Sequence, residues 1–235
     1  MPGQSRRDWI RLAAAGAYGK TTVTGLTSIP PKDEVSRDPA LAALLLTVRG
    51  FSAHHDFRGL EKLMLPTFRV DFDFGKGPQT FQRRWHPESP SSALWATLDR
   101  LLSLGGTFYS DTLFAVPYVY TQFPAELDPL GYVVATRPDT QLLEAPKPDA
   151  RTVASVDYAV IPLARRLQPP VTMTSRPYLE AKVEGAGQCF VAQSSVYSPA
   201  AYRAFFEKRK GRWYWISLVC ATLAEPPDLH KKPRH

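Results

Sequence analysis

The run Tyr178-Leu179-Glu180-Ala181-Lys182-Val183 is one of several short strand-like stretches that decide the fold expected for this chain of 235 residues. Turn residues separate it from the others, which are Thr152-Val153-Ala154-Ser155-Val156, Ala159-Val160-Ile161-Pro162-Leu163 and Cys189-Phe190-Val191. Their spacing predicts a small closed β-barrel. A barrel of this size exposes a groove and little else, which favours binding over catalysis.

An aromatic hairpin follows these strands toward the C-terminus. We expect strands over residues 202–207 and 212–218, joined by a charged turn that contains Gly211. Aromatic side chains fall on both faces of the two strands, and strands that are apolar on both faces are usually covered on both. The hairpin therefore either joins the barrel to the rest of the chain or presents an aromatic shelf to a ligand.

The N-terminal half mixes helix and strand patterns. Asp38-Pro39 is a strong helix start, and further helices are expected over residues 56–64 and 92–104. Between them, apolar and polar residues alternate over residues 68–74, which predicts a half-buried strand. We expect residues 80–85 to return as its partner strand.

These patterns predict an α+β N-terminal layer followed by an all-β barrel, rather than a doubly wound parallel sheet. Residues 1–37 are expected to form a signal-like or flexible leader, and residues 223–235 a disordered tail. The α+β domain is placed at residues 38–130. The barrel, with its closing hairpin, is placed at residues 131–222.

Composition limits the classes of partner. The chain is 44% apolar and 22% charged, which is ordinary for a globular protein, and its formal charge of +7 suits an acidic partner. Basic residues are scattered in pairs such as Arg6-Arg7 and Arg83-Arg84. Nucleic-acid binding requires a concentrated basic surface in a recognisable module, so we do not expect it. Apolar runs stay shorter than the roughly 20 residues that span a bilayer.

The order of the C-terminal segments resembles the bacterial SH3-like (SH3b) domain. The resemblance is carried by Gln141-Leu142-Leu143-Glu144-Ala145-Pro146, by the strand-like runs quoted above and by Gly185-Ala186-Gly187. The segment 198–206 together with Gly211-Arg212-Trp213 resembles the closing hairpin of exported SH3-domain proteins of unknown function. Further matches, at Phe74-Gly75 and Trp85 among others, extend the resemblance to residues 38–222.

The resemblance implies a small antiparallel barrel that docks the stem peptides of peptidoglycan, usually beside a separate catalytic domain. This chain departs from the family pattern at three places. Leu143-Glu144 replaces an arginine, Tyr178 replaces a tryptophan, and Cys189 stands in a turn where glycine is usual. Each change lies where a ligand would dock, so the fold transfers better than the ligand. A Pro-rich insertion between Leu167 and Arg176 would lie at the barrel rim, where loops can set specificity.

From these observations we expect a non-enzymatic cell-envelope binding module whose barrel contacts a peptide, such as that of peptidoglycan, or another cell-wall ligand. The residues expected to line its binding surface are Tyr178, Tyr197, Tyr202, Trp213 and Trp215. The sequence leaves the oligomeric state open.

The alternative is a small-molecule binder or a hydrolase-type enzyme that uses a pocket in the N-terminal domain. Imidazoles titrate near neutral pH, and paired carboxylates can exchange protons or bind a cation. Its candidate residues are His54, His55, Asp71, Asp73 and His86. Helix capping and solvent exposure explain the same residues without a function. No G-x-S-x-G, H-E-x-x-H or phosphate-loop motif is present, so the sequence predicts no cofactor and no metal.

The N-terminus and the cysteines bear on the compartment. Ser5-Arg6-Arg7-Asp8-Trp9-Ile10-Arg11, before an Ala-rich segment, resembles the twin-arginine export signal over residues 1–20. It implies a periplasmic or secreted protein. A cytoplasmic protein with an Ala-rich helix at this place is the alternative. Cys189 and Cys220 either form one bridge within the C-terminal sheet or are buried as small apolar residues.

Overall fold

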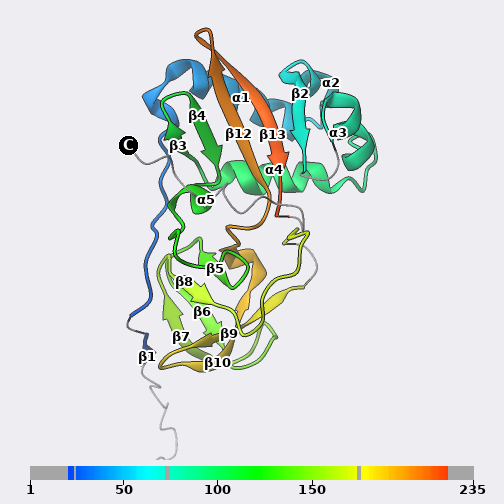
Figure 1. The fold of residues 1–235 in the computed structure, drawn as a ribbon. Coiled ribbons are helices and arrows are strands. Elements are labelled where there is room, and N and C mark those ends of the chain that lie inside the picture. Colours follow the sequence, from blue (N-terminus) through cyan, green and yellow to red (C-terminus); the bar gives the residue numbers. More distant parts are fainter. Residues whose placement is uncertain (1–20, 24, 72–74, 174–175, 222–235) are drawn as a thin grey trace, which may run out of the picture.

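The aromatic hairpin lies in the middle of a five-stranded sheet (Figure 1). Its strands β12 (Arg203–Arg209) and β13 (Arg212–Val219) pair with each other. On the outer edge of β12 lies the antiparallel strand β4 (Leu113–Val116), followed by β3 (Thr107–Ser110). On the outer edge of β13 lies the parallel strand β2 (Met64–Val70). The hairpin therefore belongs to the N-terminal lobe and is not the closing hairpin of a C-terminal barrel that the sequence led us to expect, because both of its edges are paired with N-terminal strands.

The computed structural model describes residues 21–23, 25–71, 75–173 and 176–221, and it has two lobes. In the first lobe, helices α1 (Pro39–Ala53) and α4 (Ala93–Ser103) pack with the five-stranded sheet in one apolar core. Both helices begin at a side-chain cap, since Asp38 and Ser92 each accept hydrogen bonds from the first free amides. The shorter helices of this lobe are η1 (Val35–Arg37), α2 (Phe57–Glu61), α3 (Pro78–Trp85) and α5 (Tyr118–Gln122).

Helix α3 corrects the expectation of a strand over residues 80–85. Gly77 takes a φ of 91°, which ends the preceding turn, and Pro78 follows as the first helical residue, where its fixed φ suits a helix. Phe81 and Trp85, four residues apart, then share the face that is buried in the core. The strand β2 itself begins before the predicted one and ends at Val70, and residues 72–74 lie outside the described part of the chain.

The second lobe consists of β-strands in two sheets. One has the order β1-β7-β6-β10-β9, and the other has the order β11-β5-β8. Among the described residues the two sheets are not joined into one closed barrel. Their strands are β1 (Thr21–Thr22), β5 (Tyr132–Ala135), β6 (Thr140–Leu143), β7 (Thr152–Val156), β8 (Val160–Pro162), β9 (Tyr178–Val183), β10 (Gly187–Ala192) and β11 (Val196–Tyr197), with the short helix η2 (Gln193–Ser195) before β11.

The segment before helix α1 is an integral part of the fold and not the flexible leader expected from its composition. Strand β1 pairs in parallel with β7, and the amide of Ile29 donates to the carbonyl of Tyr158 at 2.7 Å. The side chain of Ile29 is buried against the second lobe. The chain then runs upward to the first lobe (Figure 1), where the Glu34 carboxylate accepts from the amide of Phe108 at 3.0 Å. This segment therefore connects both lobes. Residues 1–20 lie outside the described part of the chain.

Asp38 connects helix α1 to the hairpin. Its Oδ1 accepts from the amides of Ala40 and Leu41, while its Oδ2 accepts from Lys208 Nζ at 2.8 Å and from Trp213 Nε1 at 2.9 Å. The hydrogen bonds from Lys208 and Trp213 are the main cause that lowers the pKa of this carboxyl from 3.8 to about 2. The charged form of Asp38 is therefore the form that holds the helix and the hairpin together.

We expect Asp38→Asn to lower the free energy of unfolding by about 1–2 kcal/mol at neutral pH, the usual worth of hydrogen bonds to a charged group. Because the folded-state pKa is depressed, the stabilisation is complete above pH 3.8 and is lost as the pH falls toward about 2. Urea unfolding at a series of pH values should show the difference between wild type and variant shrinking over that window. Asp149→Asn, at an exposed carboxylate, is the matched control, and a difference that stays constant with pH would contradict the assignment.

Candidate functional site

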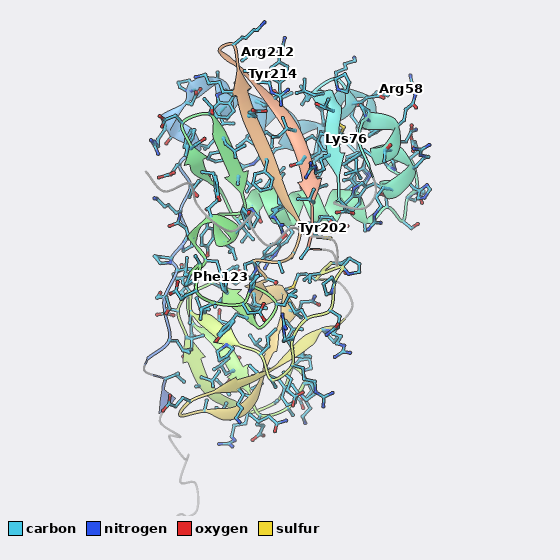
Figure 2. All side chains as sticks on the ribbon, in the orientation of Figure 1. Arg58, Lys76, Phe123, Tyr202, Arg212 and Tyr214 are labelled. Carbon is cyan, nitrogen blue, oxygen red and sulfur yellow. The ribbon has the colours of Figure 1, made fainter. Side chains whose placement is uncertain are left out.

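A cleft of about 600 Å³ lies where the two lobes meet. The first lobe contributes one face of helix α4, and the second lobe contributes the beginning of β9 and the segment from β10 to β11. Three of the five residues that the sequence predicted for a binding surface line this cleft, namely Tyr178, Tyr197 and Tyr202. Figure 2 shows Tyr202 at the junction of the lobes.

The three tyrosines differ in how far their side chains are exposed to the cleft. Tyr178 is half-buried, at the start of β9, and its ring is open to a ligand. Tyr197 and Tyr202 are buried, and the hydroxyl of Tyr197 donates to the carbonyl of Tyr202 at 2.6 Å. Burial raises the pKa of both buried phenols, so they stay neutral. Tyr178 is therefore the aromatic side chain available for contact, while Tyr197 and Tyr202 form the wall behind it.

Arg100 on helix α4 joins the lobes at the edge of the cleft. Its Nη2 donates to the carbonyls of Ser194, at 2.9 Å, and of Val196, at 3.4 Å, and to the hydroxyl of Thr136 at 3.3 Å. These three acceptors all belong to the second lobe. Burial lowers the pKa of the Arg100 guanidinium, and the charge of nearby Arg137, which also lines the cleft, lowers it further. The cleft thus carries two arginines close together.

Neither arginine was among the residues that the sequence predicted for a binding surface. On helix α4 the polar side chains follow the usual solvent-facing stripe, and an arginine in such a stripe looks like a surface residue. Its role depends on the neighbouring lobe, which is distant in sequence. No local pattern in the sequence distinguishes Arg100 or Arg137 from other single arginines on the surface.

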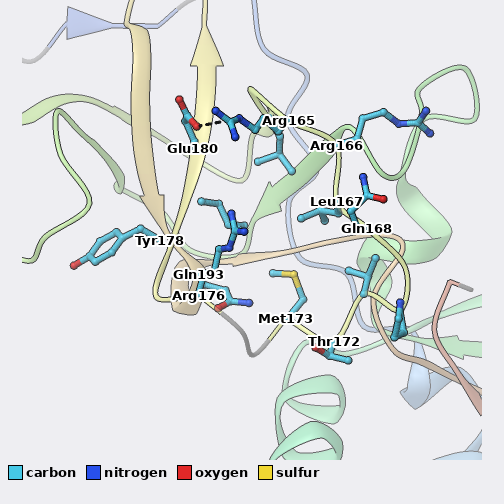
Figure 3. Close-up of a pocket in the computed structure, with 14 residues that line it drawn as sticks. Arg165, Arg166, Leu167, Gln168, Thr172, Met173, Arg176, Tyr178, Glu180 and Gln193 are labelled. Atoms are coloured by element: carbon cyan, nitrogen blue, oxygen red, sulfur yellow. Dashed lines mark ion pairs between the residues drawn. The ribbon is translucent and has the colours of Figure 1, made fainter.

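A smaller cleft of about 210 Å³ adjoins the first one. Both clefts include Met173, Tyr178 and Gln193 in their lining, so these residues separate them. The smaller cleft is bounded by the Pro-rich insertion that the sequence placed at a barrel rim, and it carries three arginines, as Figure 3 shows. Arg165 pairs with Glu180 at 3.9 Å, and Arg166 pairs with Asp128 at 2.8 Å.

A third cleft, of about 520 Å³, extends the interlobe cleft along the start of helix α4 and shares Tyr202 with it. Its lining includes Arg84 and His86. Arg84 donates from Nη2 to the Tyr202 hydroxyl at 3.0 Å and from Nε to Asp71 Oδ2 at 3.2 Å. The Asp71 carboxylate also accepts from the amide of Cys220 at 3.1 Å. Asp71 is therefore a buried structural acceptor and not a solvent-facing residue of a strand.

The two tryptophans predicted for the binding surface are buried instead. Trp215 is 0% exposed and packs edge-on against Phe68 and roughly parallel to Phe206. Trp213 is 4% exposed and donates its indole N–H to Asp38. Both rings belong to the core of the first lobe, so neither is open to a ligand. Of the two roles left open for these aromatics, they have the structural one, within the first lobe.

The residues named for an alternative catalytic site are not gathered. His54 lies at the end of helix α1 with Nδ1 2.8 Å from the Gly50 carbonyl, and His55 stacks on Trp95 with ring centroids 4.9 Å apart. None of the three clefts contains either of them, and His86 is alone of the set in the third cleft. Asp73 lies outside the described part of the chain. Within that part, no group of three or more His, Cys, Asp or Glu side chains could hold a metal ion.

The cysteines lie in different lobes. Cys189 belongs to the core of the second lobe and Cys220 to the core of the first, and both are free and buried. Burial raises the pKa of Cys189 and, with the nearby Asp71 carboxylate, raises the pKa of Cys220 to about 12. Both thiols are therefore protonated and serve as small apolar residues. No helix of the described chain has the length and apolar character needed to cross a membrane.

Comparison with protein-family models, with curated proteins and with solved structures finds no match to this chain.

Trp215→Ala should lower the free energy of unfolding by about 3–5 kcal/mol, as expected when a large aromatic side chain is removed from a closed core. Tyr214→Ala, at the adjacent half-buried position of the same strand, is the control and should cost less than about 1 kcal/mol. Chemical denaturation followed by circular dichroism measures both. Equal losses for the two variants would mean that Trp215 is not part of the core.

Proposed function

We propose that this protein is a non-enzymatic binding protein of the cell envelope, and that its interlobe cleft takes a peptide or a cell-wall ligand. The observation that carries the proposal is the presence of Tyr178, Tyr197 and Tyr202 in one cleft of about 600 Å³. This volume is typical of pockets that hold small ligands. An aromatic ring such as Tyr178, with one apolar face and one polar end, suits a sugar ring or a peptide backbone.

The composition of the cleft favours binding over a reaction. Hydroxyls, amides, arginines and apolar groups line it, and its lining among the described residues includes no histidine, carboxylate or cysteine. Hydrolysis by nucleophilic or general-base catalysis uses such a group close to the substrate. This composition supports a site that holds a ligand without changing it.

We further propose that the second lobe is an SH3-like barrel. Two isolated bridges support this, since Leu163 pairs with Ala181 and Ser28 pairs with Ala159, which brings the edges of the two sheets close together. The resemblance of residues 131–222 to the SH3b domain implies docking of peptidoglycan stem peptides on the barrel. In this chain the end of β9 that carries Tyr178 faces the interlobe cleft, so the cleft is the proposed docking place.

Retention on purified peptidoglycan tests the proposal. Wild type should be retained more strongly than an unrelated protein of equal net charge, and Tyr178→Ala should weaken retention about fivefold or more, because an aromatic contact contributes roughly 1 kcal/mol beyond its buried area. Tyr214→Ala is the matched control, because Tyr214 lies at the far end of the first lobe (Figure 2). Equal retention of wild type and the unrelated basic protein would refute the proposal.

The twin-arginine-like segment leads us to propose a periplasmic or secreted location. We expect cleavage before Thr21, because Thr21 and Thr22 pair with Ala154 and Ser155 of β7 and are needed in the mature fold. Mass spectrometry of the protein recovered from its host should show this new N-terminus. Replacing both Arg6 and Arg7 with lysine should leave the full-length chain in the cytoplasm, whereas an unprocessed wild-type chain in the cytoplasm would rule out export.

A further inference from the structure

The interlobe cleft has an unbalanced positive charge. Arg100 and Arg137 line it, and its described lining contains neither aspartate nor glutamate. Arg137 is exposed and forms no ion pair with any described residue, although most exposed arginines of the second lobe do, as Arg151 does with Glu144. Among the described residues, therefore, no carboxylate in the lining compensates these two charges.

The hydrogen bonds of Arg100 fix its guanidinium while leaving part of it available. All three contacts with the second lobe come from Nη2, and no described residue accepts a hydrogen bond from Nε or Nη1 of Arg100. A guanidinium held in this way cannot turn freely, so its remaining N–H groups have a set direction. Such an arrangement can direct a single charge-assisted hydrogen bond, from Nε or Nη1, at one oxygen of an anion.

The neighbourhood of Arg100 disfavours its own charge. Burial lowers the pKa of its guanidinium and the adjacent Arg137 lowers it further, because like charges repel most strongly where water is partly excluded. An anion bound between them would offset both effects. The cleft is thus electrostatically complementary to a negative group.

The smaller cleft carries a second uncompensated cation on the other side of Tyr178 and Gln193. Of its three arginines, Arg165 and Arg166 have acidic partners in Glu180 and Asp128. Arg176 is exposed and forms no ion pair with any described residue. Two positively charged sites are therefore separated by residues that line both clefts, among them Met173, Tyr178 and Gln193.

We propose that the ligand of the cleft is a short peptide with two carboxylates, one bound by Arg100 and Arg137 and the other by Arg176. Tyr178 and Gln193 contact the backbone between them. This inference rests on the proposed function and specifies it, because it requires two acidic groups and not merely a peptide or a sugar. The two adjoining clefts give such a ligand room on both sides of Tyr178.

Isothermal titration of the full chain with the probe peptide acetyl-Glu-Ala-Ala tests the proposal. Its acidic side chain and C-terminus supply the two carboxylates, and three companion peptides replace one or both with amides. Neutralising either carboxylate should weaken binding about tenfold, the usual effect of losing one hydrogen bond to a charged group. Binding should also weaken steeply as salt screens the charges.

Two variants then assign the carboxylates. Arg137→Gln should weaken binding of the diacid about tenfold. It should not change the affinity for the peptide in which the carboxylate bound by Arg100 and Arg137 is already an amide. Arg176→Gln should likewise weaken binding of the diacid but not of the peptide in which the carboxylate bound by Arg176 is an amide. Both residues are exposed, so the variants should fold. Arg58→Gln, the same exchange on the far side of the first lobe, is the control and should bind as wild type does (Figure 2).

Several results would overturn the inference. These are equal affinity for the diacid and the diamide, no binding of the diacid, equal losses for Arg137→Gln and Arg58→Gln, or tighter binding of inorganic phosphate than of the diacid. Retention on peptidoglycan is measured independently. If retention still depends on Tyr178 while the peptides show no preference for carboxylates, the proposed function stands and the dicarboxylate ligand is refuted.

Discussion

The insertion of the hairpin β12–β13 between β2 and β4 is the constraint on which the rest of the structure depends. β2 and β4 lie early in the chain and do not pair with each other. The sheet of the first lobe therefore lacks its central strands until the hairpin pairs with both of them. Its buried rings, among them Trp215 and Phe206, then fill the space beneath helices α1 and α4. Contacts this distant in sequence carry a large loop-closure cost, which the burial of these rings must offset.

This constraint also determines how the lobes meet. All strands of the second lobe except β1 lie between α5 and β12 in the sequence, so the second lobe is attached to the first at both of its ends. The segment from β1 to η1 adds a third connection, held by Ile29 at one lobe and Glu34 at the other. Arg100 adds hydrogen bonds across the junction itself. With three chain crossings and a direct contact, the lobes have little freedom to rotate, and the cleft between them is formed before any ligand arrives.

Local patterns in the sequence were sufficient for part of this fold. Helix α1 starts behind Asp38 and helix α4 behind Ser92, where capping residues and apolar spacing placed them, and β7 and β9 cover the predicted runs. Helix α3 was missed because its six-residue pattern fits a strand as well as a helix, and Pro78 was not weighed as a helix start. The place of the hairpin in the fold could not be predicted. An apolar pattern on both faces of a strand indicates that both faces are covered, but it does not indicate which elements cover them.

The candidate site was also only partly predictable, because local patterns do not show which distant segments pack together. Tyr178, which the sequence singled out because it stands in place of a tryptophan of the SH3b pattern, lines the interlobe cleft, whereas Trp213 and Trp215 are buried with the hairpin that carries them. Arg100 and Arg137 come to line one cleft only because helix α4 faces the segment from β10 to β11 in the folded protein. The local sequence of one lobe does not show which of its residues will line a cleft formed with the other lobe.

The preformed cleft explains why uncompensated arginines can persist there. In a flexible junction, Arg100 and Arg137 would move apart and be solvated separately, which removes their repulsion. The three connections prevent this, so the repulsion remains in the unbound protein and a bound anion relieves it. Because the cleft is already ordered, binding does not bear the entropic cost of assembling it. The connections that hold the lobes together thus keep the partly buried Arg100 close to Arg137, and the two arginines form one anion site.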